Sequence, residues 1–253
     1  MNIFDTHAHY DDDAFNEDRF ELLSSMPENN VKYIINQGVD IKSSLDSIAL
    51  SEKYPYIYAA VGIHPLDVKK MEDISKIKEL AKHKKVVAIG EIGLDYYYET
   101  ETKKLQLKYF KNQLTLANEL NLPVVIHDRD AHKDTLDTLK EIKVNNSGVI
   151  HCYSGSLEMA KELLKLGFYL GFDGPVTFKN AKTVIEVLKY IPLDKILVET
   201  DAPYLTPAPF RGKRNNSMYL TYVIETIAKI KEISSDEMAN ITLNNAKTLF
   251  KIS

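Results

Sequence analysis

Residues Phe4–Asp13 read FDTHAHYDDD, and the interpretation of the whole chain starts from this stretch. An apolar start leads into His7 and His9 and then into an acidic loop, which is typical of a β-strand that carries functional groups at its C-terminal end. Side chains alternate along a strand, so both imidazoles point to the same side, with Asp5 behind them. Two imidazoles at this spacing can bind one metal ion. A pair of loop histidines would read the same way, so the interpretation depends on further ligands.

The composition is that of an ordinary globular protein. The 253 residues are 44% hydrophobic and 27% charged, which excludes a disordered chain. The net charge of -4 argues against a protein held on duplex DNA or membranes by a broad positive field. Cys152 is the single cysteine, and no secretory leader or membrane-spanning run is indicated. We expect a cytoplasmic protein without membrane association or an obligate protein partner.

Short β-branched segments alternate with amphipathic segments along the chain. The expected strands are Ile3–His9, Val31–Val39, Ile57–His64, Val86–Leu94, Pro123–Asp128, Gly148–Tyr153, Phe168–Phe172 and Ile196–Asp201. The expected helices are Ala14–Ser25, Ile41–Tyr54, Glu72–His83, Thr102–Asn121, Ala131–Lys143, Leu157–Leu166, Ala181–Tyr190, Met218–Lys231 and Ser235–Phe250. Strand–helix units repeated in this number are typical of an α/β (β/α)8 TIM barrel. No linker divides the chain, so we expect a single domain over residues 1–253.

Histidines and carboxylates stand at the ends of several expected strands, where the loops of such a barrel form the active-site face. The metal-ligand candidates are His7, His9, Glu91, His127, His151 and Asp201. Six ligands exceed the three that the protein supplies to a typical single catalytic zinc. We therefore expect two divalent ions bridged by Glu91. His7, His9 and Asp201 would hold one ion, and His127 and His151 the other.

A water held between two cations is acidified, and we expect it to be the nucleophile. Asp201 is expected to orient this water and take its proton, so Asp201 and Glu91 are the predicted catalytic residues. Asp5 and Glu199 share strand faces with ligands. They are expected either to orient an imidazole or a water, or to be buried polar residues satisfied by the backbone. His64, at the end of the third strand, is expected to contact a ligand or the substrate.

Cations near the same face indicate an anionic substrate. Arg129 stands two residues after His127, and the loop after the eighth strand contains Arg211, Lys213 and Arg214. Arginine binds phosphate bidentately and lysine binds it as a point charge, so phosphate contacts are expected, with a solvated loop as the alternative. Aromatic residues that are candidates for stacking on unpaired bases are Tyr96, Tyr97, Tyr98, Tyr153 and Phe210.

The chain resembles the TatD family of metal-dependent deoxyribonucleases, within the amidohydrolase-like barrels. The matching segments are FDTHAHYD, GIHP, GEIGLDYY, LNLPVVIH, HCYSG, ETDAPYL and RGKRN, in order from Phe4 to Asn215. The resemblance places the family's ligands on the six candidates above. It implies metal-dependent hydrolysis of DNA phosphodiesters from the 3′ end of single strands or frayed ends. Asn216-Ser217 after Asn215 differs from the usual family pattern, and the sequence leaves Mg²⁺, Mn²⁺ and Zn²⁺ open.

Two alternatives use the same barrel differently. Related enzymes hydrolyse a small ester, lactone, amide or aminoacyl ester, and many of them bridge two ions with a carbamylated lysine on the fourth strand. In this chain that strand offers Glu91 and no nearby lysine. A non-catalytic binding barrel would have lost ligands, and none is lost. The expected activity is therefore that of a deoxyribonuclease, with small-molecule ester or amide hydrolysis as the alternative.

Overall fold

The computed structural model describes residues 1–253. The strands are β1 (Ile3–Ala8), β2 (Val31–Gln37), β3 (Ile57–Val61), β4 (Val86–Asp95), β5 (Val124–Arg129), β6 (Gly148–Ile150), β7 (Tyr169–Phe172) and β8 (Ile196–Val198). The helices are α1 (Arg19–Ser25), α2 (Ile41–Lys53), α3 (Ile74–Leu80), α4 (Lys103–Leu120), α5 (His132–Glu141), α6 (Leu157–Lys165), α7 (Lys182–Tyr190), α8 (Leu220–Lys231) and α9 (Ser235–Phe250). Each expected strand and helix is present, with ends that differ by a few residues.

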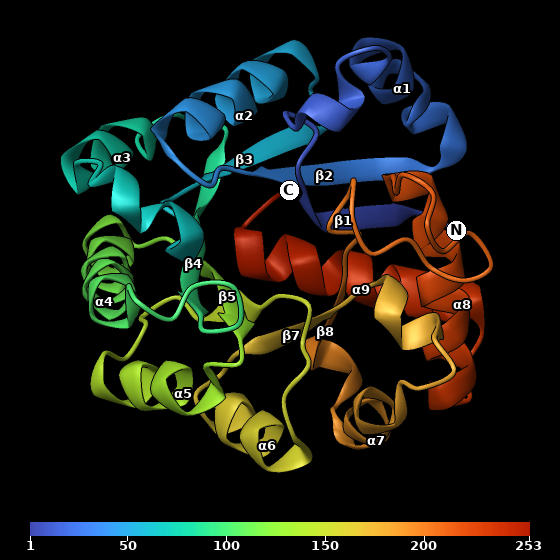
Figure 1. Ribbon diagram of the computed structural model, residues 1–253. Coiled ribbons are helices and arrows are strands. Elements are labelled where there is room, and N and C mark those ends of the chain that lie inside the picture. Colours follow the sequence, from blue (N-terminus) through green and yellow to red (C-terminus); the bar gives the residue numbers. More distant parts are fainter.

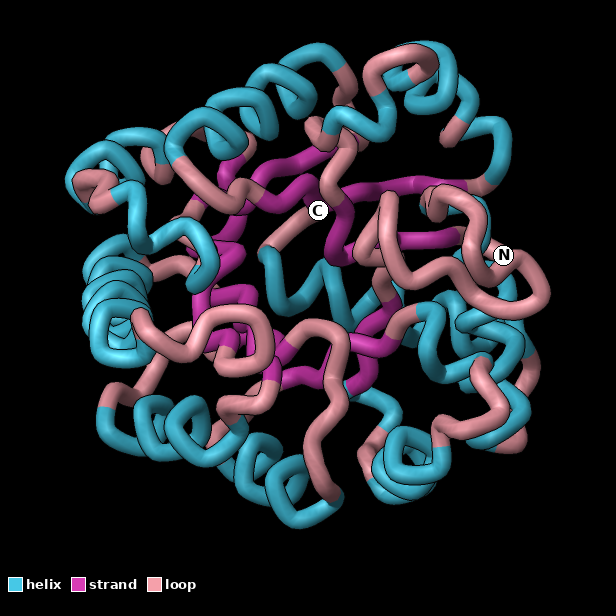
Figure 2. The backbone as a smooth tube through the Cα atoms, viewed as in Figure 1, coloured by secondary structure: helices cyan, strands magenta, loops and turns pink.

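The eight strands form one parallel sheet in the order β1 to β8, which confirms the predicted (β/α)8 barrel. Helices surround the strands, which form the inner ring (Figures 1 and 2). The ring meets between β8 and β1, where the His9 amide donates to the Ala202 carbonyl at 2.8 Å and the Asp201 amide donates to the His7 carbonyl at 2.9 Å. This seam therefore joins two segments that carry candidate ligands.

The C-terminal helix α9 packs against the interior of the barrel. The side chains that point into the barrel beside this helix are apolar. They come from all eight strands, including Phe4 and Leu197, and pack with Leu249 and Phe250 of α9. In Figure 1, α9 crosses the middle of the ring of strands. A barrel of this size is filled by side chains, and here α9 completes the filling. The polar site is thereby confined to the other end of the strands.

Two buried glutamines of α4 hold the ends of neighbouring strands. Gln113 accepts from the Ile63 amide at 2.8 Å and donates to the Ile63 carbonyl at 3.0 Å. Gln106 makes the same pair of bonds with Asp95, at 2.9 and 3.0 Å. Each glutamine side chain thus makes the two hydrogen bonds that a neighbouring strand would make to the backbone of that residue. Buried backbone N–H and C=O groups require such partners. His64 and the end of β4 are positioned in this way.

Several strands end earlier than expected, because the chain turns as soon as it reaches the site. β3, β6 and β8 stop at Val61, Ile150 and Val198, so the functional residues that follow them belong to loops. Cys152 and Asp201 have φ values of +45° and +57°, in the left-handed region that ends an extended strand. Backbone in this region is uncommon for residues other than glycine and is concentrated at functional sites.

The first helix is also shorter than the expected span of residues 14–25. A 3₁₀ helix, η1 (Asp13–Phe15), begins there, and α1 starts only at Arg19. The Arg19 guanidinium donates to the carbonyl oxygens of Tyr10, Asp11 and Asp12. These bonds satisfy loop carbonyls outside a helix, so the segment after β1 stays irregular. None of the helices combines the length and the apolar character that a membrane crossing requires.

Candidate metal centre

Glu91, on β4, lies at the centre of the residues expected to bind metal. Its Oε1 lies 2.9 Å from His127 Nδ1 and 2.8 Å from His151 Nε2. Its Oε2 faces the other way, 3.4 Å from His7 Nε2 and 3.6 Å from His9 Nε2. The two oxygens of one carboxylate therefore face two different groups of imidazoles, which is the arrangement of a bridging ligand.

Asp201 completes the group around His7 and His9. Its Oδ1 lies 3.5 Å from His7 Nε2 and 3.4 Å from His9 Nε2, and the two imidazole nitrogens are 3.1 Å apart. Ligands about 2.0–2.1 Å from one tetrahedral ion would be separated from each other by about 3.3 Å. The separations from 3.1 to 3.6 Å among these atoms and Glu91 Oε2 match that spacing.

The chemistry of this donor set also fits divalent cations. All six expected ligands are brought together, in three clusters whose ligating atoms lie within 4.8 Å of one another. These clusters are His7 with His9 and Asp201, His7 with Glu91 and His151, and Glu91 with His127 and His64. Pairs of imidazole nitrogens approach to 3.1 Å, at His7 with His9 and at His127 with His151. Converging nitrogen lone pairs are stabilised by a cation, and neutral imidazole with carboxylate is a favoured ligand set for such ions. The residues present therefore fit divalent metal binding.

Asp95, the last residue of β4, orients one of these imidazoles. Its Oδ2 lies 3.1 Å from His127 Nε2, while the His127 Nδ1 atom faces Glu91. A carboxylate that accepts from the outer ring nitrogen leaves the inner nitrogen free for a metal ion. Asp95 Oδ1 also accepts from the amides of Tyr97 and Tyr98. Sequence reasoning missed this residue, although its place in the GEIGLDYY segment was a usable signal.

His64 lies beside the centre, and its tautomer argues against a ligand role. Its Nε2 is 3.5 Å from Glu91 Oε1, and its ring packs edge-on against His127. Its Nδ1 accepts from the Leu66 amide at 3.2 Å. A neutral ring that accepts at Nδ1 carries its proton on Nε2. The side chain can therefore donate to Glu91 or to a substrate, as the sequence had suggested.

Asp5 and Glu199 differ in what they contact. Asp5 accepts from the amides of His7 and Thr200 and from the hydroxyls of Thr200 and Ser217. It therefore holds the backbone at the β1–β8 seam and contacts no imidazole ring. Glu199 Oε1 lies 3.6 Å from His151 Nδ1 and accepts from the Cys152 amide, so it contacts a ligand.

Burial and neighbouring charges shift the pKa values of the ligands in opposite directions. Burial would raise the pKa of Glu91, but the imidazoles of His151, His64 and His7 hold it well below its usual value. Burial would lower the pKa of His9, yet its bond to Asp201 and the charge of Glu91 raise it to about 9. Burial raises the pKa of Asp5 to about 7, despite its four donors. The lowered pKa values of Glu91 and Asp201 keep these two carboxylates ionised, so the centre attracts positive charge.

All the expected ligands except His7 line a pocket of about 540 Å³. Arg129 stands on its wall and lies over the rings of Tyr97 and Tyr98, 4.5 and 4.8 Å from their centres. Tyr98 and Tyr204 line the same pocket and are 64% and 53% exposed, so aromatic surface is available at its mouth. A cation and exposed rings therefore flank the candidate metal centre.

The other expected substrate contacts lie elsewhere. Arg214 forms a double ion pair with Asp18 and packs over Phe15, which ties its loop to η1. Arg211 lies over Phe178 and Lys213 over Phe210, and neither lines the pocket. Among the remaining aromatic candidates, Tyr96 donates to Asp134, Tyr153 is buried, and Phe210 stacks on Tyr219.

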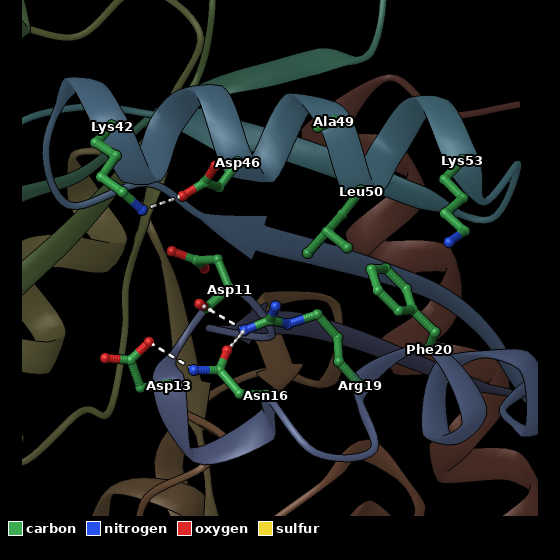
Figure 3. A pocket seen from close by; sticks show the side chains of 10 residues that line it. All are labelled: Asp11, Asp13, Asn16, Arg19, Phe20, Lys42, Asp46, Ala49, Leu50 and Lys53. Carbon is green, nitrogen blue, oxygen red and sulfur yellow. Dashed lines mark hydrogen bonds and ion pairs between the residues drawn. The ribbon is translucent and has the colours of Figure 1, made fainter.

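A separate hollow of about 420 Å³ lies between η1, α1 and α2 (Figure 3). Its charged groups are occupied by each other and by the backbone. Lys42 pairs with Asp46, Lys53 lies over the Phe20 ring, and Arg19 binds backbone carbonyls and Asn16. These contacts hold α1 against α2, and we assign the hollow a structural role.

Comparison with known proteins places this centre in a family. The family model described as TatD related DNase matches residues 4–251. The uncharacterized metal-dependent hydrolase YabD of Bacillus subtilis is 48% identical over 253 residues, covering 99% of both chains. The uncharacterized metal-dependent hydrolase YcfH of Escherichia coli K12 is 38% identical, covering 100% of this chain and 97% of the relative. The crystal structure of YjjV, a TatD homolog of Escherichia coli K12, has a TM-score of 0.94 at 32% identity and covers 99% of this chain and 98% of its own.

Proposed function

The chain belongs to the TatD family of metal-dependent hydrolases, and from this premise we propose that it hydrolyses DNA phosphodiesters at the 3′ end of single strands or frayed ends. The observation that carries the proposal is the carboxylate of Glu91, whose two oxygens face two separate ligand groups. Two ions held by a shared carboxylate suit the in-line displacement at phosphorus. A small ester or amide requires no cation at the mouth such as Arg129.

The ligand groups suggest how the chain would hold its metal. His7, His9 and Asp201 would hold one divalent ion, His127 and His151 would hold a second, and Glu91 would join them. When bound, the ions would supply acidification of a water and neutralisation of phosphate charge. Asp95 keeps the imidazole of His127 in the orientation that this requires. Glu199 accepts from the Cys152 amide and so fixes the backbone beside His151.

The remaining steps fall to side chains of the pocket. Asp201, whose pKa is lowered by its bond to His9 and the nearby imidazoles despite burial, accepts the proton of the attacking water. The water oxygen bonds to phosphorus, and the bond from phosphorus to the 3′ oxygen of the preceding nucleotide breaks. That oxygen receives a proton, so the products are a 5′-mononucleotide and a strand one nucleotide shorter. Arg129 and His64 Nε2 donate to phosphate oxygens.

The proposal is tested with a 5′-labelled single-stranded oligonucleotide and protein stripped of metal. Mg²⁺, Mn²⁺ or Zn²⁺ is added back, and Asp201→Asn serves as the inactive control. We expect a metal-dependent ladder that shortens from the 3′ end and is absent with the variant. If the metal-loaded protein cleaves no oligonucleotide but hydrolyses small esters or amides, the DNA assignment is wrong.

A further inference from the structure

A second pocket opens on the same centre from the other side. It has a volume of about 360 Å³ and lies beyond the ends of β5, β6 and β7, against the 3₁₀ helix η4 (Gly174–Thr177). His127, Arg129, His151, Asp201 and Leu205 line both this pocket and the larger one described above. A substrate whose reacting phosphate lies at these residues therefore extends into two spaces, one on each side.

The second pocket is lined by two buried carboxyl groups that each have an unpartnered oxygen. Asp173 is 4% exposed and Asp128 is 8% exposed, and neither Asp173 Oδ2 nor Asp128 Oδ1 has a hydrogen-bond partner. The other oxygen of Asp128 pairs with His132 Nδ1 at 2.9 Å. Buried polar atoms nearly always have a partner in folded proteins, so two exceptions in one pocket point to a ligand that supplies donors.

The lining defines the chemistry of that ligand. The carboxyl oxygens accept from hydroxyl or amino groups and give no favourable contact to a phosphate. Burial raises the pKa of Asp173 well above its usual value, and a carboxyl oxygen still accepts in the uncharged form. Phe172, Val176 and Val184 supply apolar contacts to the same pocket, whose other lining is largely polar and includes Arg129, which it shares with the larger pocket. The ligand therefore has an apolar face and hydroxyl donors, and its anionic group lies toward Arg129.

We propose that this pocket holds the terminal nucleoside of the strand, with its 3′-hydroxyl donating to Asp173. The inference rests on the proposed nuclease function and adds to it the residue that recognises the strand end. The terminal sugar is one ester bond from the reacting phosphate, so it enters the smaller pocket while the rest of the strand leaves through the larger pocket past Tyr98 and Tyr204. Only a strand with a free end fits, which makes the enzyme release one nucleotide at a time.

The test compares two single-stranded oligonucleotides of the same sequence, one ending in a normal 3′-hydroxyl and the other in a 2′,3′-dideoxynucleotide. The metal-loaded protein should remove the dideoxynucleotide with a kcat/KM at least about tenfold lower, because a site built to bind a hydroxyl discriminates strongly against its absence. The Asp173→Ala variant should cleave the normal strand about tenfold more slowly and should no longer distinguish the two ends.

Controls separate this inference from the proposed function. Asp130→Asn removes an exposed carboxylate at the rim of the same pocket and should keep the full discrimination. If Asp173→Ala does not fold, Asp173→Asn is measured in its place, because it retains an oxygen acceptor. This variant should still distinguish the two strand ends, at least in part. Equal cleavage of both strands by the unmodified protein, or unchanged discrimination in Asp173→Ala, would overturn the pocket assignment and leave the nuclease function standing. Cleavage of neither strand with any metal would overturn both.

Discussion

At the scale of single residues, the centre depends on how one buried carboxylate is surrounded. Glu91 is 3% exposed, and such a group is costly to bury unless charges and donors compensate it. Here imidazole nitrogens of five histidines lie within 3.6 Å of its oxygens. The same contacts lower its pKa and hold it where two ligand groups meet. Its loss should therefore affect the metal before it affects the fold.

The Glu91→Ala variant should lose turnover by at least about a thousandfold, because no other side chain joins the two ligand groups. Its circular dichroism spectrum should match that of the unmodified protein. Kinetics with saturating metal check the first statement, and Glu101→Ala, an exposed glutamate on the loop after β4, is the control. Turnover at the original rate would exclude the bridging role.

The Asp95→Asn variant tests a residue that touches no expected ion. The substitution keeps an acceptor for His127 Nε2 but removes its charge, so metal affinity should fall by about tenfold to a hundredfold. Calorimetric titration of stripped protein with Zn²⁺ or Mn²⁺ measures the change. Asp134→Asn, which removes a carboxylate bound to Tyr96, should leave the affinity as it was. Equal metal affinities of the two variants would show that Asp95 does not support metal binding.

Arg129→Ala and Arg211→Ala form a matched pair for phosphate binding. Arg129 lines the pocket of the centre, whereas Arg211 lies over Phe178 outside it. We expect Arg129→Ala to raise KM for an oligonucleotide by about tenfold, since a hydrogen bond to a charged group contributes about 1.5–3 kcal/mol. Steady-state kinetics should show little change for Arg211→Ala. If KM rises for Arg211→Ala and not for Arg129→Ala, the phosphate contact lies in the loop after β8.

At the scale of elements, ends of strands are held by side chains of distant segments. Gln106 and Gln113 of α4 bind the ends of β4 and β3, and Asp5 of β1 binds the segment after β8. Each bond fixes backbone at or next to a residue of the centre: Gln106 binds Asp95 itself, Gln113 binds the residue before His64, and Asp5 binds the residue before Asp201.

Asp5→Ala should destabilise the protein by at least about 2 kcal/mol, because it leaves several buried donors at the β1–β8 seam without an acceptor. Denaturation by urea measures the loss. Glu17→Ala, an exposed carboxylate on the segment before α1, should cost less than about 0.5 kcal/mol. Similar midpoints for the two variants would show that the seam is held by other contacts.

At the scale of the whole molecule, the centre joins residues that are up to 194 positions apart in the chain, from His7 to Asp201. An ion bound there stabilises the closed barrel, because the unfolded chain cannot assemble the same ligands. The bond to Asp201 and the charge of Glu91 raise the pKa of His9 to about 9, so we expect a proton on this imidazole near neutral pH when no ion is bound. Metal and protons therefore compete for the site.

Removal of metal should accordingly lower the Tm, and the effect should depend on pH. At a metal concentration one hundred times Kd, the ion adds about 2.7 kcal/mol, or about 5–10 °C in Tm for a chain of this length. A group whose pKa is raised to about 9 must release its proton on binding, so affinity falls as pH decreases below that value. Calorimetric scans with and without chelator should show a larger shift at pH 8 than at pH 6. A Tm shift that becomes larger toward low pH would contradict the competition between metal and protons.

Some properties of this protein follow from the sequence alone. Alternating β-branched and amphipathic segments depend on local side-chain spacing, so all eight strands and the barrel were predictable. The ligand candidates were predictable too, because the C-terminal ends of parallel barrel strands share one face. The segment GEIGLDYY and the other matching stretches identified the family, which residues 4–251 confirm.

Other properties were decided only by the tertiary structure. The register of β1 against β2 and of β4 against β5 shifts near the site, and left-handed residues end β6 and β8, so alternation along a strand does not give side-chain direction there. For this reason the contacts of Asp5 and the role of Asp95 were not visible in the sequence. The ion pair of Arg214 with Asp18 and the unpartnered oxygens of Asp128 and Asp173 likewise depend on segments far apart in the chain. Local spacing determines which elements form, whereas the contacts between their ends exist only once the barrel has closed.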